Sequence, residues 1–115
     1  MKREEIKTYK DACKVIGRKP RTYKDKHLNL YEQLSTIIAA LNFISNNNKS
    51  YKPDRWLHYY VYASKTQRAF CLCSSYSANA IFTPVGTPFK LKMISDGNYL
   101  IANFEELLNE WFWGE

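Results

Sequence analysis

The stretch Leu28 to Ile44, LNLYEQLSTIIAALNFI, decides the architecture of this chain. Its apolar residues recur three and four positions apart, which places them on one face of a helix. They are Leu30, Leu34, Ile37, Ile38, Leu41 and Ile44. No other segment is as long, as apolar and as free of Gly and Pro. We therefore expect a long helix here, with the rest of the core packed against it.

The length predicts a single domain over residues 1–115, because a second core in a chain of this size would be too small. Apolar residues make up 45% of the chain, enough for a globular core without disulfides. The longest apolar run, residues 37–41, is far shorter than the roughly 20 residues that span a bilayer. The first residues contain no apolar segment of the signal-peptide kind. We therefore expect a cytosolic protein that does not engage a membrane.

The local signals outside the long helix predict helices at both ends of the chain. Thr8 and Asp11 form a capping-box pattern before a short helix over residues 9–16, and Gly17 suits its left-handed end. Thr22 or Asp25 can cap the long helix, and the polar residues 45–48 should end it. A last helix should begin near residues 95–98 and run to the end, with apolar residues at helical spacing: Leu100, Phe104, Leu107, Leu108 and Trp111.

Between these helices the pattern changes from helical to alternating after Pro53. Aromatic, β-branched and alternating segments predict strands over residues 56–63, 69–75, 80–82 and 89–93. Residues 89–93 alternate between apolar and basic, so we expect a strand with one wet face. The predicted fold is α+β: two N-terminal helices, a three- to four-stranded antiparallel meander, and a C-terminal helix packed on one face of the sheet.

The cysteines and histidines do not form a metal-binding or catalytic pattern. Cys71 and Cys73 would lie about 7 Å apart on one face of a strand, which is poor disulfide geometry. Cys13 is distant in sequence, and the only histidines are His27 and His58. We expect structural roles for the thiols and neither a metal site nor a cofactor.

Catalysis has equally little support in the sequence. Glu105 and Glu106 are adjacent on a predicted helix and cannot face each other as an acid and base pair. His58 has no nucleophile motif around it, and the four glycines form no phosphate-binding loop. We therefore expect a protein that is not an enzyme.

Charge is concentrated at the two ends of the chain. Residues 1–26 contain ten Lys or Arg and four Asp or Glu, whereas residues 96–115 contain five acids and no Lys or Arg. One interpretation is a basic surface for nucleic acid, whose candidate residues are Lys14, Arg18, Lys19, Arg21 and Lys24. The other is that the basic segment packs beside the acidic last helix, within the chain or in a neighbouring copy.

The strand predicted over residues 56–63 has large side chains on both faces. One face carries Trp56, His58, Tyr60 and Tyr62, with Lys52 and Arg55 nearby and Lys90 and Lys92 as candidate neighbours. Aromatic and basic side chains together suit single-stranded nucleic acid and also protein-binding hot spots. A third interpretation is that tyrosines or a second copy of the chain simply cover the sheet. Trp111 and Trp113 cannot both face one core, so Trp113 is a second candidate anchor for a protein.

Three segments resemble a known family: IKTYKDACKVIG (6–17), IIAALNF (37–43) and KPDRW-x-HYY (52–60). Together with the closing strand and aromatic helix, they are similar to small uncharacterised proteins of Bacteroidales phages and related mobile elements. The resemblance implies a phage or mobile-element origin and an accessory role, and it implies no reaction.

These observations predict a non-enzymatic, phage-type accessory protein that binds another protein. Its partner would be a virion component or a host system that it inhibits, and its location the host cytoplasm or the virion. The predicted protein-binding residues are Trp56, His58, Tyr60, Tyr62 and Trp113. A small basic nucleic-acid-binding protein is the alternative function, and a homo-oligomer is an alternative assembly.

Overall fold

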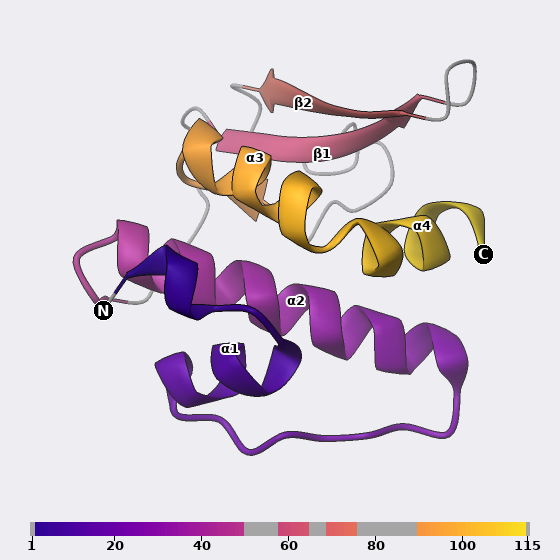
Figure 1. Cartoon of the computed structure of the whole chain (residues 1–115), viewed down its shortest axis with the longest axis horizontal. Helices are drawn as coiled ribbons and strands as arrows, with labels where there is room; N and C mark the ends of the chain where they lie inside the picture. The colour runs from indigo at the N-terminus through magenta and orange to yellow at the C-terminus, as the bar shows by residue number, and fades with distance from the viewer. Residues whose placement is uncertain (1, 50–57, 65–68, 76–89, 115) are drawn as a thin grey trace.

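The computed structural model describes residues 2–49, 58–64, 69–75 and 90–114. Helix α2 (Lys26–Ser45) lies at the centre, with α1 (Tyr9–Ile16) on one side of it. Helices α3 (Ile94–Asn103) and α4 (Glu105–Trp113) lie on the other side (Figure 1). Strands β1 (His58–Ser64) and β2 (Ala69–Ser75) lie beyond α3, which separates them from the central helix.

Local sequence signals account for α1. The backbone N–H of Asp11 donates to Thr8 Oγ1 at 3.2 Å, and the Thr8 N–H donates to Asp11 Oδ2 at 3.1 Å. The backbone donor of Lys7, together with that of Thr8, lowers the pKa of Asp11. Gly17 ends the helix with a φ of 67°, in the left-handed region that glycine adopts without a steric penalty. The predicted helix over residues 9–16 and its caps are confirmed.

Helix α2 is capped by Asp25, whose Oδ1 accepts from the Leu28 N–H at 2.9 Å. It ends at Ser45, and Asn47 and Asn48 then have positive φ values of 57° and 60°. The predicted long helix is therefore confirmed. Its predicted apolar face is buried except for Ile44, which is partly buried, and Thr36 and Ala40 are buried as well. Helix α1 contributes buried residues beside it, so α2 is packed on more than one side.

The strands form a sheet with the order β2-β1-β3. Strand β1 (His58–Ser64) pairs antiparallel with β2 (Ala69–Ser75) in one continuous register. The short β3 (Lys90–Leu91) pairs with the other edge of β1, through Tyr60 with Lys90 and Tyr59 with Leu91. Strand β1 is therefore the central strand of the sheet, with β2 on one edge and β3 on the other.

The predicted fold class, an α+β fold with a three- to four-stranded meander and one C-terminal helix, is wrong. Helices occupy more than half of the described residues. Of the described residues in the strand predicted over 89–93, only the two residues of β3 are in a strand, and β3 pairs with β1 rather than β2, which is not meander order. The segment predicted as a strand over 80–82 lies outside the described residues.

A side chain of α2 binds the outer edge of the third strand. Asn42, only 5% exposed, donates from Nδ2 to the Lys90 carbonyl at 2.8 Å. Its Oδ1 accepts from the Lys92 N–H at 3.0 Å. The carboxamide thus satisfies backbone groups that another strand would otherwise pair with. The chain then turns, and α3 begins one residue after Met93.

The predicted single C-terminal helix is wrong because the chain leaves helical geometry at Phe104. This residue has φ −127° and ψ 34° and ends α3, while α4 starts directly after it. Its side chain is buried in the core cluster with Leu100 and Leu108. The apolar spacing continues across this break and therefore did not indicate it.

The N-terminal residues are fastened to α3. A short helical turn, η1 (Arg3–Glu5), precedes the fully buried Ile6. The Tyr99 hydroxyl donates to the Ile6 carbonyl at 2.7 Å, and Arg3 Nη1 lies 3.0 Å from Asp96 Oδ1. The first and last thirds of the chain therefore form one core around α2.

Candidate binding surface

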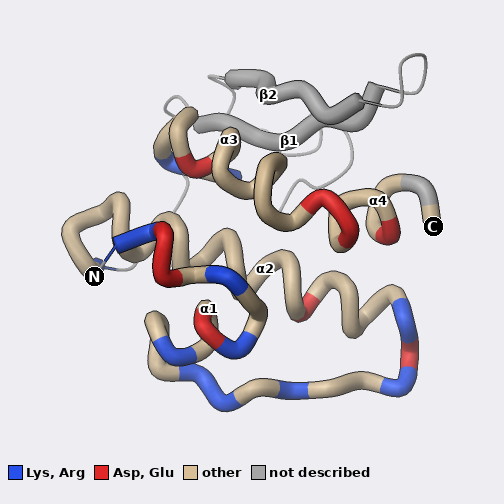
Figure 2. Tube along the Cα trace, in the orientation of Figure 1, with Lys and Arg blue, Asp and Glu red and all other residues tan. Residues whose placement is uncertain are grey.

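A basic surface covers α1 and the connection that follows it. We define the basic surface as Lys14, Arg18, Lys19, Arg21 and Lys24, all of which are exposed. The connection, residues 17–25, runs back along the length of α2, so α1 and α2 point the same way (Figure 1). Its cations line the outer side of this part of the molecule (Figure 2). All five residues that the sequence predicted for nucleic-acid binding are thus exposed, and they are spread over α1 and the connection.

Hydrogen bonds hold this connection against α2. The Tyr9 hydroxyl accepts from the Arg21 backbone N–H at 2.8 Å and donates to Glu32 Oε2 at 2.8 Å. Arg18 Nη1 donates to Thr36 Oγ1 at 2.9 Å, and the Thr36 hydroxyl donates to Glu32 at 3.0 Å. Arg18 and Glu32 also form an ion pair at 3.7 Å. The backbone between Arg18 and Arg21 is therefore fixed at two points.

Tyr9 remains a neutral donor in this network. Desolvation by burial raises its pKa to about 12, and the hydrogen bond to the Glu32 side chain contributes to this rise. The phenol therefore keeps its proton throughout the physiological range, and the link from the connection to Glu32 does not depend on pH there.

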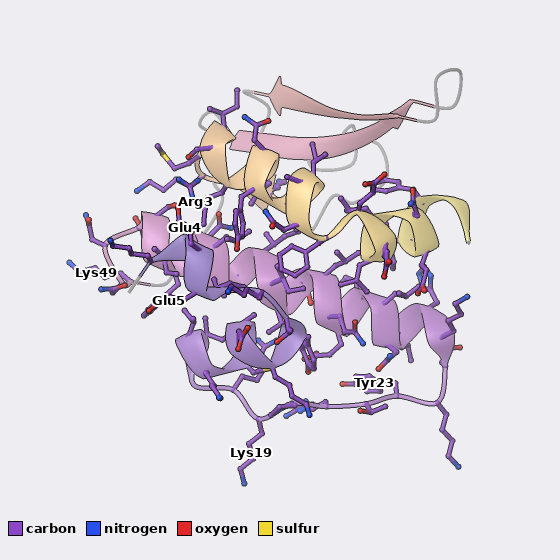
Figure 3. All side chains as sticks on the ribbon, in the orientation of Figure 1. Arg3, Glu4, Glu5, Lys19, Tyr23 and Lys49 are labelled. Atoms are coloured by element: carbon purple, nitrogen blue, oxygen red, sulfur yellow. The ribbon has the colours of Figure 1, made fainter. Side chains whose placement is uncertain are left out.

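The side chains of the other four cations of the basic surface do not hold the connection against α2. Lys14, Lys19, Arg21 and Lys24 form no side-chain ion pair within the described residues. Lys19 points away from the ribbon (Figure 3). Arg18 is therefore a structural member of the surface, and the other four cations face solvent.

The acidic end of the chain interacts with the basic start at a different place. Asp96 is 1% exposed, pairs with Arg3 and accepts a hydrogen bond from the Ser45 hydroxyl. Desolvation raises the pKa of Asp96, although Ser45 and Arg3 act in the opposite direction. The ion pair between Arg3 and Asp96 is one contact between the basic start of the chain and its acidic end. The basic surface has no such partner on the described part of α4, where Glu105 and Glu106 are exposed.

Exposed aromatic and apolar side chains lie in the connection and in the first turns of α2, and they are not among the site residues predicted from the sequence. Tyr23 is 38% exposed, Leu28 52% and Tyr31 41%. His27 stacks on Trp111 of α4 with ring centroids 4.4 Å apart. The signal was present in the sequence, because positions 28 and 31 lie off the predicted apolar face of the long helix.

The predicted aromatic site on β1 is described only in its backbone. Trp56 lies outside the described residues, as do the side chains of His58, Tyr60, Tyr62 and Trp113. Tyr60 pairs with Lys90, and directly paired residues of antiparallel strands share a face of the sheet. Lys90 is only 9% exposed, so the wet face predicted for residues 89–93 is wrong at this position.

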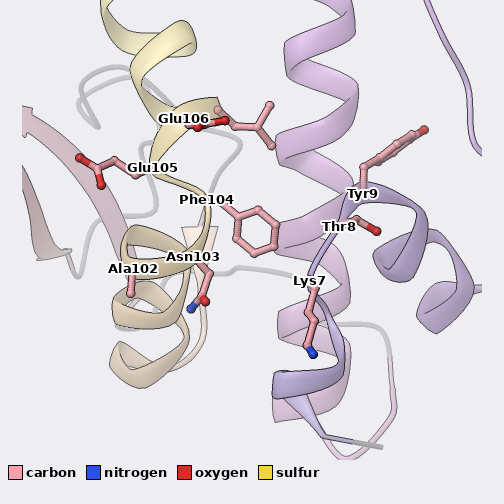
Figure 4. A pocket seen from close by; sticks show the side chains of 9 residues that line it. Lys7, Thr8, Tyr9, Ala102, Asn103, Phe104, Glu105 and Glu106 are labelled. Carbon is pink, nitrogen blue, oxygen red and sulfur yellow. The ribbon is translucent and has the colours of Figure 1, made fainter.

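A cavity of about 430 Å³ lies between the start of α1 and the break between α3 and α4. Lys7, Glu105 and Glu106 are among the residues that line it, and Phe104 points from it toward α2 (Figure 4). Among the described residues, no hydrogen bond or ion pair joins Lys7 to either glutamate. The lining therefore offers isolated charges rather than an assembled acid and base.

Within the described ranges, no three His, Cys, Asp or Glu side chains gather where they could hold a metal ion. None of the described helices has the length and apolar character needed to cross a bilayer. Neither a family model, nor a curated protein, nor a solved structure matches this chain.

Proposed function

We propose that this protein acts by binding nucleic acid through the basic surface. The observation that carries the proposal is the combination of four solvent-facing cations, Lys14, Lys19, Arg21 and Lys24, with a connection pinned by Tyr9 and Glu32. Because the backbone between the cations is already ordered, less conformational entropy is lost when a ligand binds. The role would be binding without catalysis.

The size of the charge effect follows from counterion release. Four phosphate contacts to a single strand predict a slope of about −3 for the logarithm of affinity against the logarithm of salt concentration. Affinity should therefore fall about 50-fold between about 50 mM and 200 mM salt. An apolar binding mode would show almost no such dependence.

The second candidate function is the binding of a host or virion protein by a phage-type accessory factor. The observation that favours it is on α4: Trp111 and Phe112 pack against the core. Position 113 is about 200° around the helix from position 111, hence on a different side. A cytoplasmic or virion location belongs to the same proposal. The buried Lys90 beside Tyr60 weakens the β1 face as its binding surface.

The test is a salt titration of binding to a fluorescent oligonucleotide, measured by anisotropy. The double variant Lys19→Glu with Arg21→Glu should lose affinity at least about tenfold at low salt and about half of the salt slope. Arg18 is left unchanged because its substitution would disturb the Thr36 and Glu32 contacts.

The matched control is Lys7→Glu with Lys49→Glu, which makes the same change in net charge at exposed positions outside the basic surface. It should bind nearly as well as the unsubstituted protein. Equal losses in the two double variants would mean that only net charge matters, and the absence of any binding would reject the proposal.

A further inference from the structure

An apolar patch lies where the start of α2 meets the end of α4, at one end of the molecule (Figure 1). We define the end patch as His27, Leu28, Tyr31 and Trp111. The rings of His27 and Tyr31 both lie against Trp111, with centroids 4.4 Å and 6.2 Å from that of its ring. Leu28 and Tyr31 are three positions apart on α2, so their side chains are neighbours. The four side chains therefore form one continuous surface, on which all but the partly buried Trp111 are exposed.

The two helix ends beside the end patch carry opposite charge. Helix α2 starts with Lys26, preceded by Lys24, and the carboxylate of Asp25 between them caps the Leu28 N–H. The last turn of α4 contains Glu110 and no Lys or Arg. The start of a helix also carries a partial positive charge, and its end a partial negative charge. Side-chain charge and helix dipole therefore have the same sign at each of these two ends.

The charges at these helix ends are not paired within the part of the chain that the structure describes. Lys26 is exposed and Glu110 is partly exposed. Neither forms an ion pair with another described residue. The end patch is therefore an apolar surface with an unpaired cation on one side and an unpaired carboxylate on the other.

We infer that the end patch binds a second copy of this chain, related to the first by a two-fold axis in the interface. When this axis lies across the line from the start of α2 to the end of α4, each positive helix end faces the negative end of the other copy. The apolar side chains of the two patches then meet between these charges. A partner of uniform charge would repel one of the two ends, so a second copy fits this surface better. The inference does not depend on nucleic-acid binding.

The dimer should be weak because its interface is small. Four side chains and two helix ends from each copy are far fewer than the roughly 20–30 residues a side of a stable complex. We therefore expect a dissociation constant on the order of 100 μM. Light scattering of the protein alone, from about 10 μM to about 1 mM, covers this range. The measured mass should rise from 13.6 kDa toward twice that value.

A neutral substitution tests the apolar part of the interface. Leu28→Gln removes the apolar side chain three residues after the Asp25 cap, a position where Gln favours the helix, so α2 is preserved. It should weaken dimerisation at least about tenfold, because the lost contact occurs twice in a two-fold dimer. The matched control is Ile94→Gln at the start of α3, where the exposed fraction is the same as that of Leu28, 52%. It should leave dimerisation unchanged.

Charge reversals test the pairing of the helix ends. Lys26→Glu and Glu110→Lys each place like charges opposite each other and should weaken dimerisation about tenfold. Each also complements the dipole of its own helix, so neither should unfold the protein. The double variant Lys26→Glu with Glu110→Lys has opposite charges across the interface again and should recover most of the lost affinity. Effects of opposite sign in the two single variants would show that only net charge matters, and they would overturn this pairing.

The remaining outcomes concern the assembly itself. A mass that stays at 13.6 kDa throughout the titration would overturn the inference and leave the end patch to a different protein. A mass that rises past twice this value would show open head-to-tail association and overturn the two-fold arrangement. A dimer that Leu28→Gln and Glu110→Lys both leave unchanged would have its interface elsewhere, which also overturns the inference. Because no oligonucleotide is present, none of these results decides the proposed function.

Discussion

The N-terminal turn η1 and the connection of residues 17–25 each contain arginine side chains and use them differently. In the first, Arg3 reaches Asp96, a carboxylate that is 1% exposed, and so joins the start of the chain to α3. In the second, only Arg18 has a carboxylate partner among the described residues, Glu32, while the other cations face water. A single cation, Arg3, thus serves the fold at the start of the chain, whereas the cations of the connection other than Arg18 are available to a ligand.

The largest effect should come from removing the buried carboxylate. Asp96→Ala should lower the free energy of unfolding by about 3 kcal/mol, at the low end for a broken buried pair because Arg3 is still partly exposed to water. Urea unfolding followed by circular dichroism measures it. Glu32→Ala, at the more exposed pair, should cost about 1 kcal/mol. Equal costs would contradict the distinction between the two regions.

A smaller effect should appear in the dependence of stability on pH. The pKa of Asp96 is raised in the folded protein, so the folded state binds its proton more tightly than the unfolded state. Its contribution to stability is therefore full below the ordinary carboxyl pKa of about 3.9 and declines as pH rises through the folded value.

The substitution Asp96→Asn isolates this contribution, because the other carboxyl groups are unchanged. The stability of the unsubstituted protein minus that of Asp96→Asn should decrease as pH rises from about 4. Urea unfolding at a series of pH values measures the difference. A difference that increases with pH would show that Arg3 outweighs desolvation at this carboxylate.

The smallest effect on stability should come from loosening the connection. Tyr9→Phe removes the acceptor of the Arg21 N–H and the donor to Glu32, at a cost of about 1 kcal/mol. Hydrogen exchange at the Arg21 amide should become faster. Oligonucleotide affinity should fall severalfold with an unchanged salt slope, since the cations remain while their order is lost. A changed slope would mean that the phosphate contacts themselves depend on Tyr9.

The sequence predicts well where the determining contacts are local. The caps at Thr8, Gly17 and Asp25 act within a few residues, so the positions of α1 and α2 along the chain follow from short sequence patterns. The exposure of Lys14, Lys19, Arg21 and Lys24 could be expected for a similarly general reason, since Lys and Arg side chains are rarely buried without a partner.

The failures occur where partners are distant in sequence. Asn42 pairs with the backbone of residues 90 and 92 at the edge of β3, and no local pattern indicates a contact across about fifty residues. Phe104 breaks the last helix because its ring is buried in a core shared by distant segments. The hydrogen bond between Tyr9 and Glu32 and the contact between the rings of Tyr31 and Trp111 also join residues that are distant in sequence, so local patterns did not predict them.

The most direct test of the account is the salt dependence of oligonucleotide binding by the unsubstituted protein and by Lys19→Glu with Arg21→Glu. The slope should be about −3 for the unsubstituted protein and about half of that for the double variant. Binding that does not respond to salt, or a slope that is the same in both proteins, would contradict the assignment of the basic surface to a nucleic acid.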